Sequence, residues 1–252
     1  MSVRLEKNGA IARLVLDRPE ARNAINMDMW RAFPGLIANA VSDRSIRVLE
    51  LRAAEGSGAF CAGADIKELL ANKDDMDWRD ANQAEINRVQ HELARAAIPT
   101  VAFVDGDCVG GGCGLALACD IRVATKRARF GITPGKLGLV YPLHDVKLLV
   151  DLVGPGQAKR ILFTGQLLDA AEAQRIGLIE IIADQTDELI EDILAASTYS
   201  AIENKHFVRR VLDGQVDDDN HTLRMFGAAF TREDFEEGTR AFVEKRKPSF
   251  RG

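Results

Sequence analysis

Two runs of small residues are the segments of this chain best suited to chemistry. The first, residues 60–67, reads Phe-Cys-Ala-Gly-Ala-Asp-Ile-Lys, and the second, residues 110–114, reads Gly-Gly-Gly-Cys-Gly. Each follows an apolar stretch and precedes a helical pattern, so each is expected to be a turn with free backbone N–H groups. Two such turns can aim donors at one point, which suits an oxyanion hole for developing negative charge. The runs therefore predict chemistry at a carbonyl group.

The segments around these runs alternate between strand and helix patterns. Asn8-Gly9 is a hairpin signal, and Asp65 with Glu68 is the spacing of a capping box that opens a helix at Ile66. Strands are expected at residues 3–5, 11–16, 46–52, 100–104, 121–124 and 179–182. Helices are expected at residues 26–40, 81–96, 112–118 and 143–152. The polar, acidic segment 72–80 is predicted to be a mobile stretch. Such alternation predicts an α/β fold with largely parallel strands.

From about residue 188 the pattern is helical to the end of the sequence. The chain is therefore divided into a core at residues 1–190 and a C-terminal helical region at residues 191–252. Four aromatic residues recur in this charged tail: Phe226, Phe230, Phe235 and Phe242. They indicate a face that packs on the core or on a neighbouring subunit.

Composition excludes several classes of function. The chain has 252 residues, of which 46% are hydrophobic and 28% charged, with a net charge of −5. This acidic balance argues against a general polyanion-binding surface, so nucleic acid is not an expected partner. No apolar stretch approaches the roughly 20 residues that span a bilayer, and a cytoplasmic location is expected. The four cysteines are interpreted as buried, reduced thiols, and the four histidines show no metal-ligand spacing.

Three motifs, in order, resemble the enoyl-CoA hydratase/isomerase (crotonase) superfamily over essentially the whole chain. They are residues 60–69, the run Gly-Gly-Gly-Cys-x-Leu-Ala-x-x-Cys-Asp-Ile from residue 110, and the ending Gly-Thr-Arg-Ala-Phe-Val-Glu-Lys-Arg-Lys-Pro-Ser-Phe. The resemblance implies a spiral of ββα turns and a C-terminal helical region used in trimerisation. It also implies a homotrimer or a dimer of trimers, and a coenzyme A thioester that is a substrate, with no separate cofactor.

The resemblance also carries site residues, position by position. It implies that the backbone N–H groups of Ala62 and Gly111 form the oxyanion hole. The residues expected to contact the coenzyme A thioester are Ala24, Ala62, Ala64, Asp65, Ile66, Phe226, Phe242 and Lys245, the last three partly across a subunit boundary. From the residues alone, Asp65 is better explained as a helix cap than as a catalyst, Phe242 could be core packing, and Lys245 belongs to a solvated helix end.

Two acidic side chains of the family are absent. Hydratases in this family hold a water between two glutamates, and those positions fall on Gly114 and Pro134. Neither residue can move a proton, and a positioned acid or base contributes roughly 10²–10⁴-fold in rate. Ordinary hydration is therefore disfavoured.

Residues 132–141 resemble the methylmalonyl-CoA decarboxylase branch, with Thr133-Pro134 and Tyr141 after a Leu-Gly turn. Decarboxylation needs no base, because breaking the C–C bond delivers electrons to the thioester and the hole holds the enolate. Tyr141 could orient the carboxylate or donate to the enolate. The match departs at Ala64, where the decarboxylase pattern has a histidine, and Tyr141 is also readable as an ordinary strand-end aromatic.

His144 and Asp145, at the start of an expected helix, are two further candidates. Related isomerases and dehalogenases place an aspartate on this turn, two or three residues earlier than Asp145. Histidine titrates near neutrality, whereas an aspartate there could simply complement the helix dipole. Three functions thus remain open: decarboxylase-like enolate chemistry, hydration or isomerisation by Tyr141, His144 or Asp145, and acyl-CoA binding without catalysis.

Overall fold

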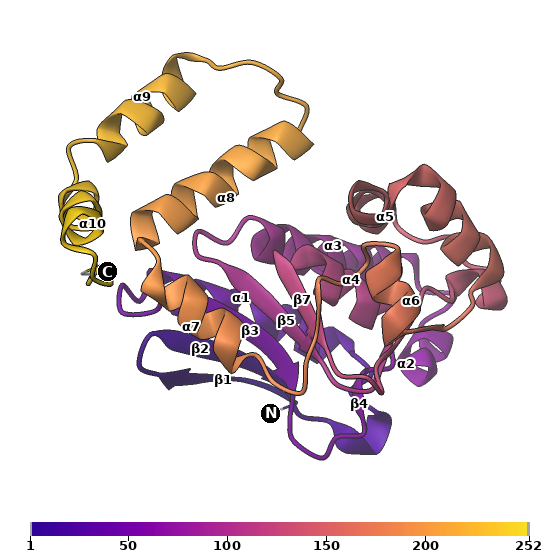
Figure 1. The fold of residues 1–252 in the computed structure, drawn as a ribbon. Helices are drawn as coiled ribbons and strands as arrows, with labels where there is room; N and C mark the ends of the chain where they lie inside the picture. The colour runs from indigo at the N-terminus through magenta and orange to yellow at the C-terminus, as the bar shows by residue number, and fades with distance from the viewer. Residues whose placement is uncertain (1, 251–252) are drawn as a thin grey trace.

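The computed structural model describes residues 2–250, whose strands form two sheets (Figure 1). The larger sheet has the order β1-β2-β3-β5-β7-β10 and the smaller β4-β6-β8-β9. Only the β1–β2 and β8–β9 pairs are antiparallel. The strands are β1 (Val3–Asn8), β2 (Ile11–Leu16), β3 (Val48–Ala53), β4 (Ala59–Cys61), β5 (Thr100–Val104), β6 (Asp107–Val109), β7 (Ile121–Ala124), β8 (Arg129–Gly131), β9 (Leu168–Asp169) and β10 (Ile181–Ile182).

Helices connect the strands and continue to the end of the described chain. They are α1 (Met27–Ser42), α2 (Ile66–Ala71), α3 (Met76–Ala94), α4 (Gly111–Ala118), α5 (Leu143–Thr164), α6 (Ala170–Arg175), α7 (Asp187–Ala195), α8 (Thr198–Leu212), α9 (Asn220–Ala229) and α10 (Glu233–Glu244), with the short 3-10 helices η1 (Pro19–Ala21) and η2 (Pro134–Leu137). Within residues 2–250, no helix combines the length and the apolar content needed to cross a membrane.

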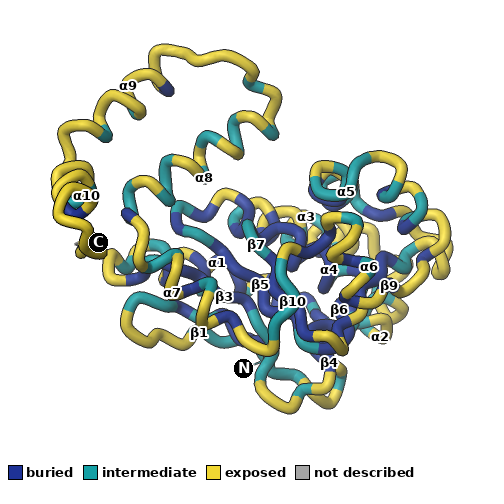
Figure 2. The backbone as a smooth tube through the Cα atoms, viewed as in Figure 1, coloured by how far each residue is buried: buried dark blue, intermediate teal, exposed yellow. Residues whose placement is uncertain are grey.

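Alternating strand residues bury both faces of the larger sheet. In β3, Leu49 and Leu51 enter the main core, whereas Val48 packs on the opposite face with Ile190 of α7. Such two-sided burial explains why the parallel strands read as short apolar runs. Figure 2 shows this buried interior beneath the helices. The predicted α/β class and the β1–β2 hairpin, in which Asn8 pairs with Ile11, are confirmed.

The C-terminal arm, residues 197–250, extends away from the sheets (Figure 1) and is largely exposed along its length (Figure 2). Tyr199 holds α8 to α9, because its hydroxyl donates to the Met225 carbonyl at 3.0 Å. The guanidinium of Arg232 lies 3.7 Å from the centre of the Tyr199 ring. The division expected at residue 190 falls within α7, so the arm begins only after that helix.

Two sequence predictions about helices are wrong. The segment expected to be a mobile stretch contains the start of α3, because the Asp75 side chain accepts from the Trp78 N–H at 2.9 Å and caps the helix. Helix α5 also runs well past residue 152, to Thr164. Gly154, with φ of 72°, kinks it, and Pro155 follows at a position where a new helical segment tolerates proline.

Candidate active site

The two glycine turns meet at the ends of neighbouring parallel strands. Strand β4 leads into the first turn and β6 into the second, and Cys61 pairs with Cys108 between them. Parallel strands place their carboxyl ends at one edge, so the two turns lie together. Gly63 has a φ of +102°, and a Cβ there would lie 3.0 Å from the Val109 oxygen and 3.6 Å from the Gly111 nitrogen. Close approach of the turns therefore requires glycine at position 63.

The prediction that Ala62 supplies a free donor is wrong. Its N–H donates to the carbonyl oxygen of Arg22 at 3.0 Å. The N–H groups of Ala64 and Gly111, in contrast, have no hydrogen-bond partner among residues 2–250. A Cβ on Gly111 would lie 3.8 Å from the Ala64 nitrogen, so the two groups are adjacent.

A short parallel bridge explains the direction of the Ala64 N–H. Ile25 donates to the Gly63 oxygen at 2.8 Å and accepts from the Asp65 N–H at 3.0 Å. In extended chain, successive N–H groups point to opposite sides, so the Ala64 N–H faces away from Ile25. The positive φ of Gly63 breaks this alternation, which leaves the Ala62 N–H on the side of Arg22.

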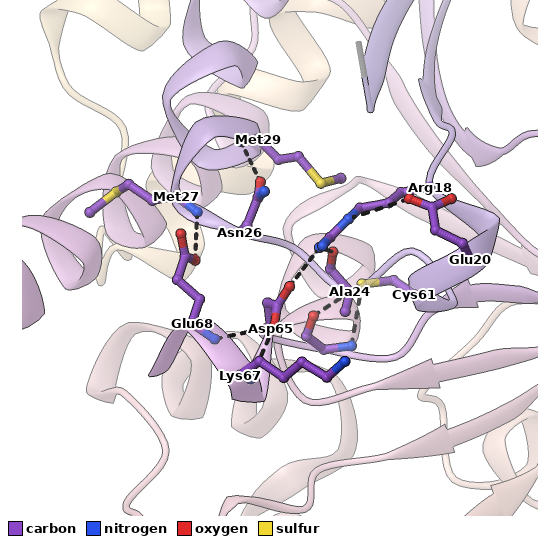
Figure 3. A network of polar contacts seen from close by, with 11 residues as sticks. Arg18, Glu20, Ala24, Asn26, Met27, Met29, Cys61, Asp65, Lys67 and Glu68 are labelled. Atoms are coloured by element: carbon purple, nitrogen blue, oxygen red, sulfur yellow. Dashed lines mark hydrogen bonds and ion pairs between the residues drawn. The ribbon is translucent and has the colours of Figure 1, made fainter. Parts of the chain in front are cut away.

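Asp65 ties the loop before α1 to the start of α2 (Figure 3). Its carboxylate accepts from the Arg18 guanidinium at 2.8 Å and from the Lys67 and Glu68 N–H groups at 3.0 and 3.3 Å. The hydrogen bond from Arg18 is the main reason that the pKa of Asp65 lies below its usual value. The capping box is only half confirmed, because the Glu68 side chain accepts from the Met27 N–H at 2.9 Å.

The same loop places the expected thioester contacts side by side. Arg18 also donates to the Ala24 carbonyl at 3.0 Å, so Ala24 lies beside Asp65. Ala62, Ala64 and Ile66 follow along the adjoining segment 62–66. Side-chain exposure differs along it, and Ile66 is 44% exposed.

Gly114 lies where helices α3, α4 and α5 meet. A Cβ on Gly114 would lie 2.3 Å from both Asp145 Oδ1 and Gln90 Nε2. Gln90, from α3, donates to Asp145 Oδ1 at 2.6 Å, and both residues are buried. Burial raises the pKa of Asp145 to about 6, although the hydrogen bond from Gln90 acts to lower it. The sequence offered no signal for Gln90, which lies far from Asp145 along the chain.

Tyr141 reaches the second glycine turn. Its hydroxyl donates to the Gly110 carbonyl oxygen at 3.1 Å, and only 8% of the residue is exposed. Burial, with the nearby Asp145 carboxylate, raises the pKa of Tyr141 well above its usual range. The phenol is therefore neutral near physiological pH and acts as a donor.

His144 does not join Tyr141 and Asp145. Its ring packs against His91 of α3, with centroids 6.4 Å apart. Burial, with His91 and the cationic side chains of Arg209, Arg95 and Lys147 nearby, lowers its pKa. Successive residues of a helix point about 100° apart, so Asp145 faces Gly114 of α4 and Gln90 of α3, while His144 faces His91 and Arg209. Pro134 begins η2 and offers no polar side-chain atom.

The three remaining predicted contacts lie on the C-terminal arm. Phe226 of α9 is 64% exposed and Phe242 of α10 is 85% exposed. Lys245 follows α10 in the left-handed conformation, with φ of 56°. Within one chain, the structure does not bring these residues to the glycine turns.

A separate groove of about 640 Å³ lies between α8 and the core. It is lined by Leu117 and Cys119, at the end of α4 opposite Gly111, and by Lys205 of α8. All four cysteines are buried and free, as predicted, and burial raises the pKa of Cys61 to about 12. The groove does not include the glycine turns, whereas Cys61 belongs to the first turn, where its Sγ accepts from the Gly63 N–H at 3.4 Å.

Comparisons with known proteins identify the family of this chain. The sequence model of the enoyl-CoA hydratase/isomerase family matches residues 6–252. The chain belongs to the enoyl-CoA hydratase/isomerase family. The resemblance seen in the sequence motifs and the crotonase-like fold are thus confirmed.

Relatives of this family are similar over nearly the whole chain. The crystal structure of an enoyl-CoA hydratase/isomerase family protein from Hyphomonas neptunium is 38% identical, with a TM-score of 0.95, covering 100% of this chain and 98% of that one. The short-chain-enoyl-CoA hydratase of Clostridium acetobutylicum is 32% identical over 255 residues, 98% of this chain and 96% of the relative. The crotonyl-CoA hydratase of Syntrophomonas wolfei is 32% identical over 254 residues, with coverage of 98% and 96%.

Proposed function

We propose that this chain binds an acyl-CoA thioester and stabilises its enolate between the N–H groups of Ala64 and Gly111. The observation that carries the proposal is that these two donors are unpartnered and adjacent at the meeting point of the glycine turns. Backbone donors of this kind stabilise charge that develops on a carbonyl oxygen, without reorganisation during the reaction. Family membership supports an acyl-CoA as the substrate class.

The reaction that this site suits best is decarboxylase-like. Gly114 and Pro134 stand at the positions of the two glutamates that would hold and activate a water. The chain therefore lacks the usual acid–base groups for hydration. Loss of CO₂ from a malonyl-type thioester needs the hole but no base to begin.

A panel of acyl-CoA esters tests the reaction type. The protein is incubated with malonyl-type esters, with crotonyl-CoA and with longer enoyl-CoAs, and products are read by mass spectrometry. We expect loss of CO₂ from a malonyl-type ester and little addition of water. Hydration of crotonyl-CoA at an ordinary rate would refute the decarboxylase-like reading. Tight binding of every ester without turnover would instead favour a binding protein.

The donor pair is tested with two substitutions at one residue. Gly111 is the first residue of α4, where proline fits the helix but lacks the N–H. Gly111→Pro should lower kcat by roughly 10²–10³-fold, the usual effect of losing one donor of an oxyanion hole. Gly111→Ala is the matched control, because its Cβ meets nothing nearer than Trp30 Cζ2 at 3.5 Å. Equal activity of the two variants would exclude a role for this donor.

Hydration is the second candidate, favoured by the names of the relatives from Clostridium acetobutylicum and Syntrophomonas wolfei. In this chain, Asp145 would have to supply the acid–base group that Gly114 lacks. The ester panel separates the two candidates, since only hydration consumes crotonyl-CoA. Asp145→Asn should then abolish hydration, whereas a variant that still hydrates at the wild-type rate would remove Asp145 from that reaction.

We also propose that the chain forms a homotrimer or a dimer of trimers in which the C-terminal arm completes the thioester site of a neighbour. Exposed aromatic side chains on the arm support this assembly. Phe226 and Phe230 lie 5.4 Å apart between ring centroids, and Phe230 and Phe235 lie 5.1 Å apart. Sedimentation velocity measures the mass of the assembly, and Phe242→Asp should raise the KM for the thioester. A monomer with an unchanged KM would contradict the proposal.

A further inference from the structure

The space beside Gly114 is filled by a carboxylate that comes from another helix. Asp145 Oδ1 lies 2.3 Å from the position that a Cβ on residue 114 would take. Any side chain there would displace Asp145 or its partner Gln90. The structure therefore couples two features of the sequence: the missing glutamate on α4 and the aspartate on α5.

This carboxylate lies close to the oxyanion hole. Residues three apart on a helix share a face, so Gly114 lies on the same face of α4 as Gly111. The axial separation of the two residues is about 4.5 Å, from a rise of about 1.5 Å per residue. Asp145 Oδ1 thus lies beside the residue that follows, by about one helical turn, the N–H that would hold the thioester oxygen.

Gln90 can serve both protonation states of Asp145. Its Nε2 donates to the carboxylate at 2.6 Å, and its buried Oε1 has no partner among the described residues. If the amide turns over, Oε1 accepts from the protonated acid while Nε2 takes the unpartnered position. One polar atom of the Gln90 amide therefore lacks a partner whether Asp145 is protonated or ionised. Asp145 can gain or lose a proton without changing the number of unpartnered polar atoms.

Burial favours a neutral acid at this position. Asp145 is 1% exposed, and desolvation disfavours its charged form. Hydrogen bonds from Gln90 and from the Tyr141 hydroxyl act in the opposite direction and lower its pKa. A pKa of about 6 leaves part of the population protonated near neutral pH. Exclusion of bulk water also keeps an enolate from taking its proton from solvent.

We propose that Asp145 is the acid that delivers a proton to the α-carbon of the enolate, with Gln90 as its positioning residue. This rests on the proposed enolate chemistry. When the C–C bond to the carboxylate breaks, CO₂ leaves and its electron pair forms the enolate. The Asp145 O–H bond then breaks, the enolate electrons form the new C–H bond, and the thioester carbonyl is restored. Asp145, left as a carboxylate, recovers a proton from water after the product has left and before the next ester binds.

Decarboxylation of a methylmalonyl-type ester in D₂O separates CO₂ release from protonation. The wild type should deliver deuterium to one face of the α-carbon, as read by NMR of the product. Asp145→Asn should still release CO₂ but lower overall turnover about 10²-fold or more, as for loss of a general acid, and give deuterium on both faces. Asp151→Asn is the matched control on α5, where Asp151 only pairs with Lys147.

The outcomes distinguish the two proposals. Stereospecific deuteration by Asp145→Asn, at the wild-type rate, overturns the role of Asp145 while leaving the enolate chemistry intact. A wild type that releases no CO₂ and exchanges no α-proton with any ester overturns both. Thioester binding and circular dichroism establish that Asp145→Asn is folded.

Gln90→Glu provides a second test that does not depend on Asp145→Asn. A second carboxyl beside Asp145 disfavours ionisation of the pair, so the high-pH limb of turnover should move up by about one unit or more. If Gln90 only fills space, Gln90→Glu will leave the high-pH limb of turnover where it is in the wild type. That result would contradict the proposal.

Discussion

The hydroxyl of Tyr141 donates to the carbonyl oxygen of Gly110 at 3.1 Å. That carbonyl belongs to the same peptide group as the Gly111 N–H, one of the two free donors. Gly110 also donates its own N–H to the Gly131 oxygen at 2.8 Å. Residue 110 is thus fixed through both its N–H and its carbonyl oxygen, and the hydrogen bond at that oxygen strengthens the Gly111 N–H of the same peptide group as a donor. Tyr141 therefore acts through the backbone of the hole.

Removal of the Tyr141 hydroxyl should weaken the hole without abolishing it. A neutral hydrogen bond contributes about 0.5–1.5 kcal/mol, which corresponds to roughly a 2- to 13-fold fall in kcat for Tyr141→Phe. The high-pH limb of turnover should move slightly upward, because the hydrogen bond from Tyr141 acts to lower the pKa of Asp145. Tyr199→Phe is the control, since it removes a similar hydrogen bond in the C-terminal arm. A fall of several thousand-fold would instead indicate direct proton transfer by Tyr141.

A methyl group at position 114 should disturb the acid pair. Gly114→Ala puts a Cβ within 2.3 Å of Asp145 Oδ1 and Gln90 Nε2. Overpacking of a buried site typically lowers the free energy of unfolding by about 1–3 kcal/mol. Urea denaturation should show this loss, and turnover should fall with it. If Gly114→Ala is as stable and active as Gly111→Ala, the contact at position 114 is not important.

The stability of the protein should depend on the charge of Asp145. Its pKa is about 6 in the folded chain, against 3.8 for the free side chain, so the folded state binds the proton more tightly. The resulting stabilisation is full below pH 3.8 and is lost as pH rises through 6. Two pKa units correspond to about 3 kcal/mol.

Asp145→Asn lacks this titration and should gain stability relative to the wild type as pH rises. Urea unfolding at pH 4 and pH 8 measures the difference in each free energy of unfolding. A mutant-minus-wild-type difference that is equal at the two pH values would show that Asp145 has an ordinary pKa in the folded chain.

Asp65 should affect substrate binding more than turnover. Asp65→Ala removes both the N-cap of α2 and the ion pair with Arg18, which together hold the loop that carries Ala24. Loss of a cap costs about 1 kcal/mol. We expect a several-fold rise in KM with a smaller change in kcat. Asp169→Ala, which removes the cap of α6, is the control. A purely catalytic effect would point to a direct role for Asp65.

Local patterns were sufficient for much of the fold. Asn8-Gly9, the apolar strand runs and the two glycine turns each identify their elements, because turn geometry and burial on both faces constrain nearby residues directly. The start of α3 was missed, since a polar surface helix carries little apolar periodicity and depends on its Asp75 cap.

By itself, the sequence determined the family, the two turns and the absence of a side chain at position 114. Only the tertiary structure decided which N–H groups are free, because a positive φ at Gly63 and the bridge to Ile25 turn Ala62 inward and Ala64 outward. It also decided which polar groups stand beside the hole. Gln90, Gly114 and Asp145 come from three helices, and packing between distant segments leaves no local pattern in the chain.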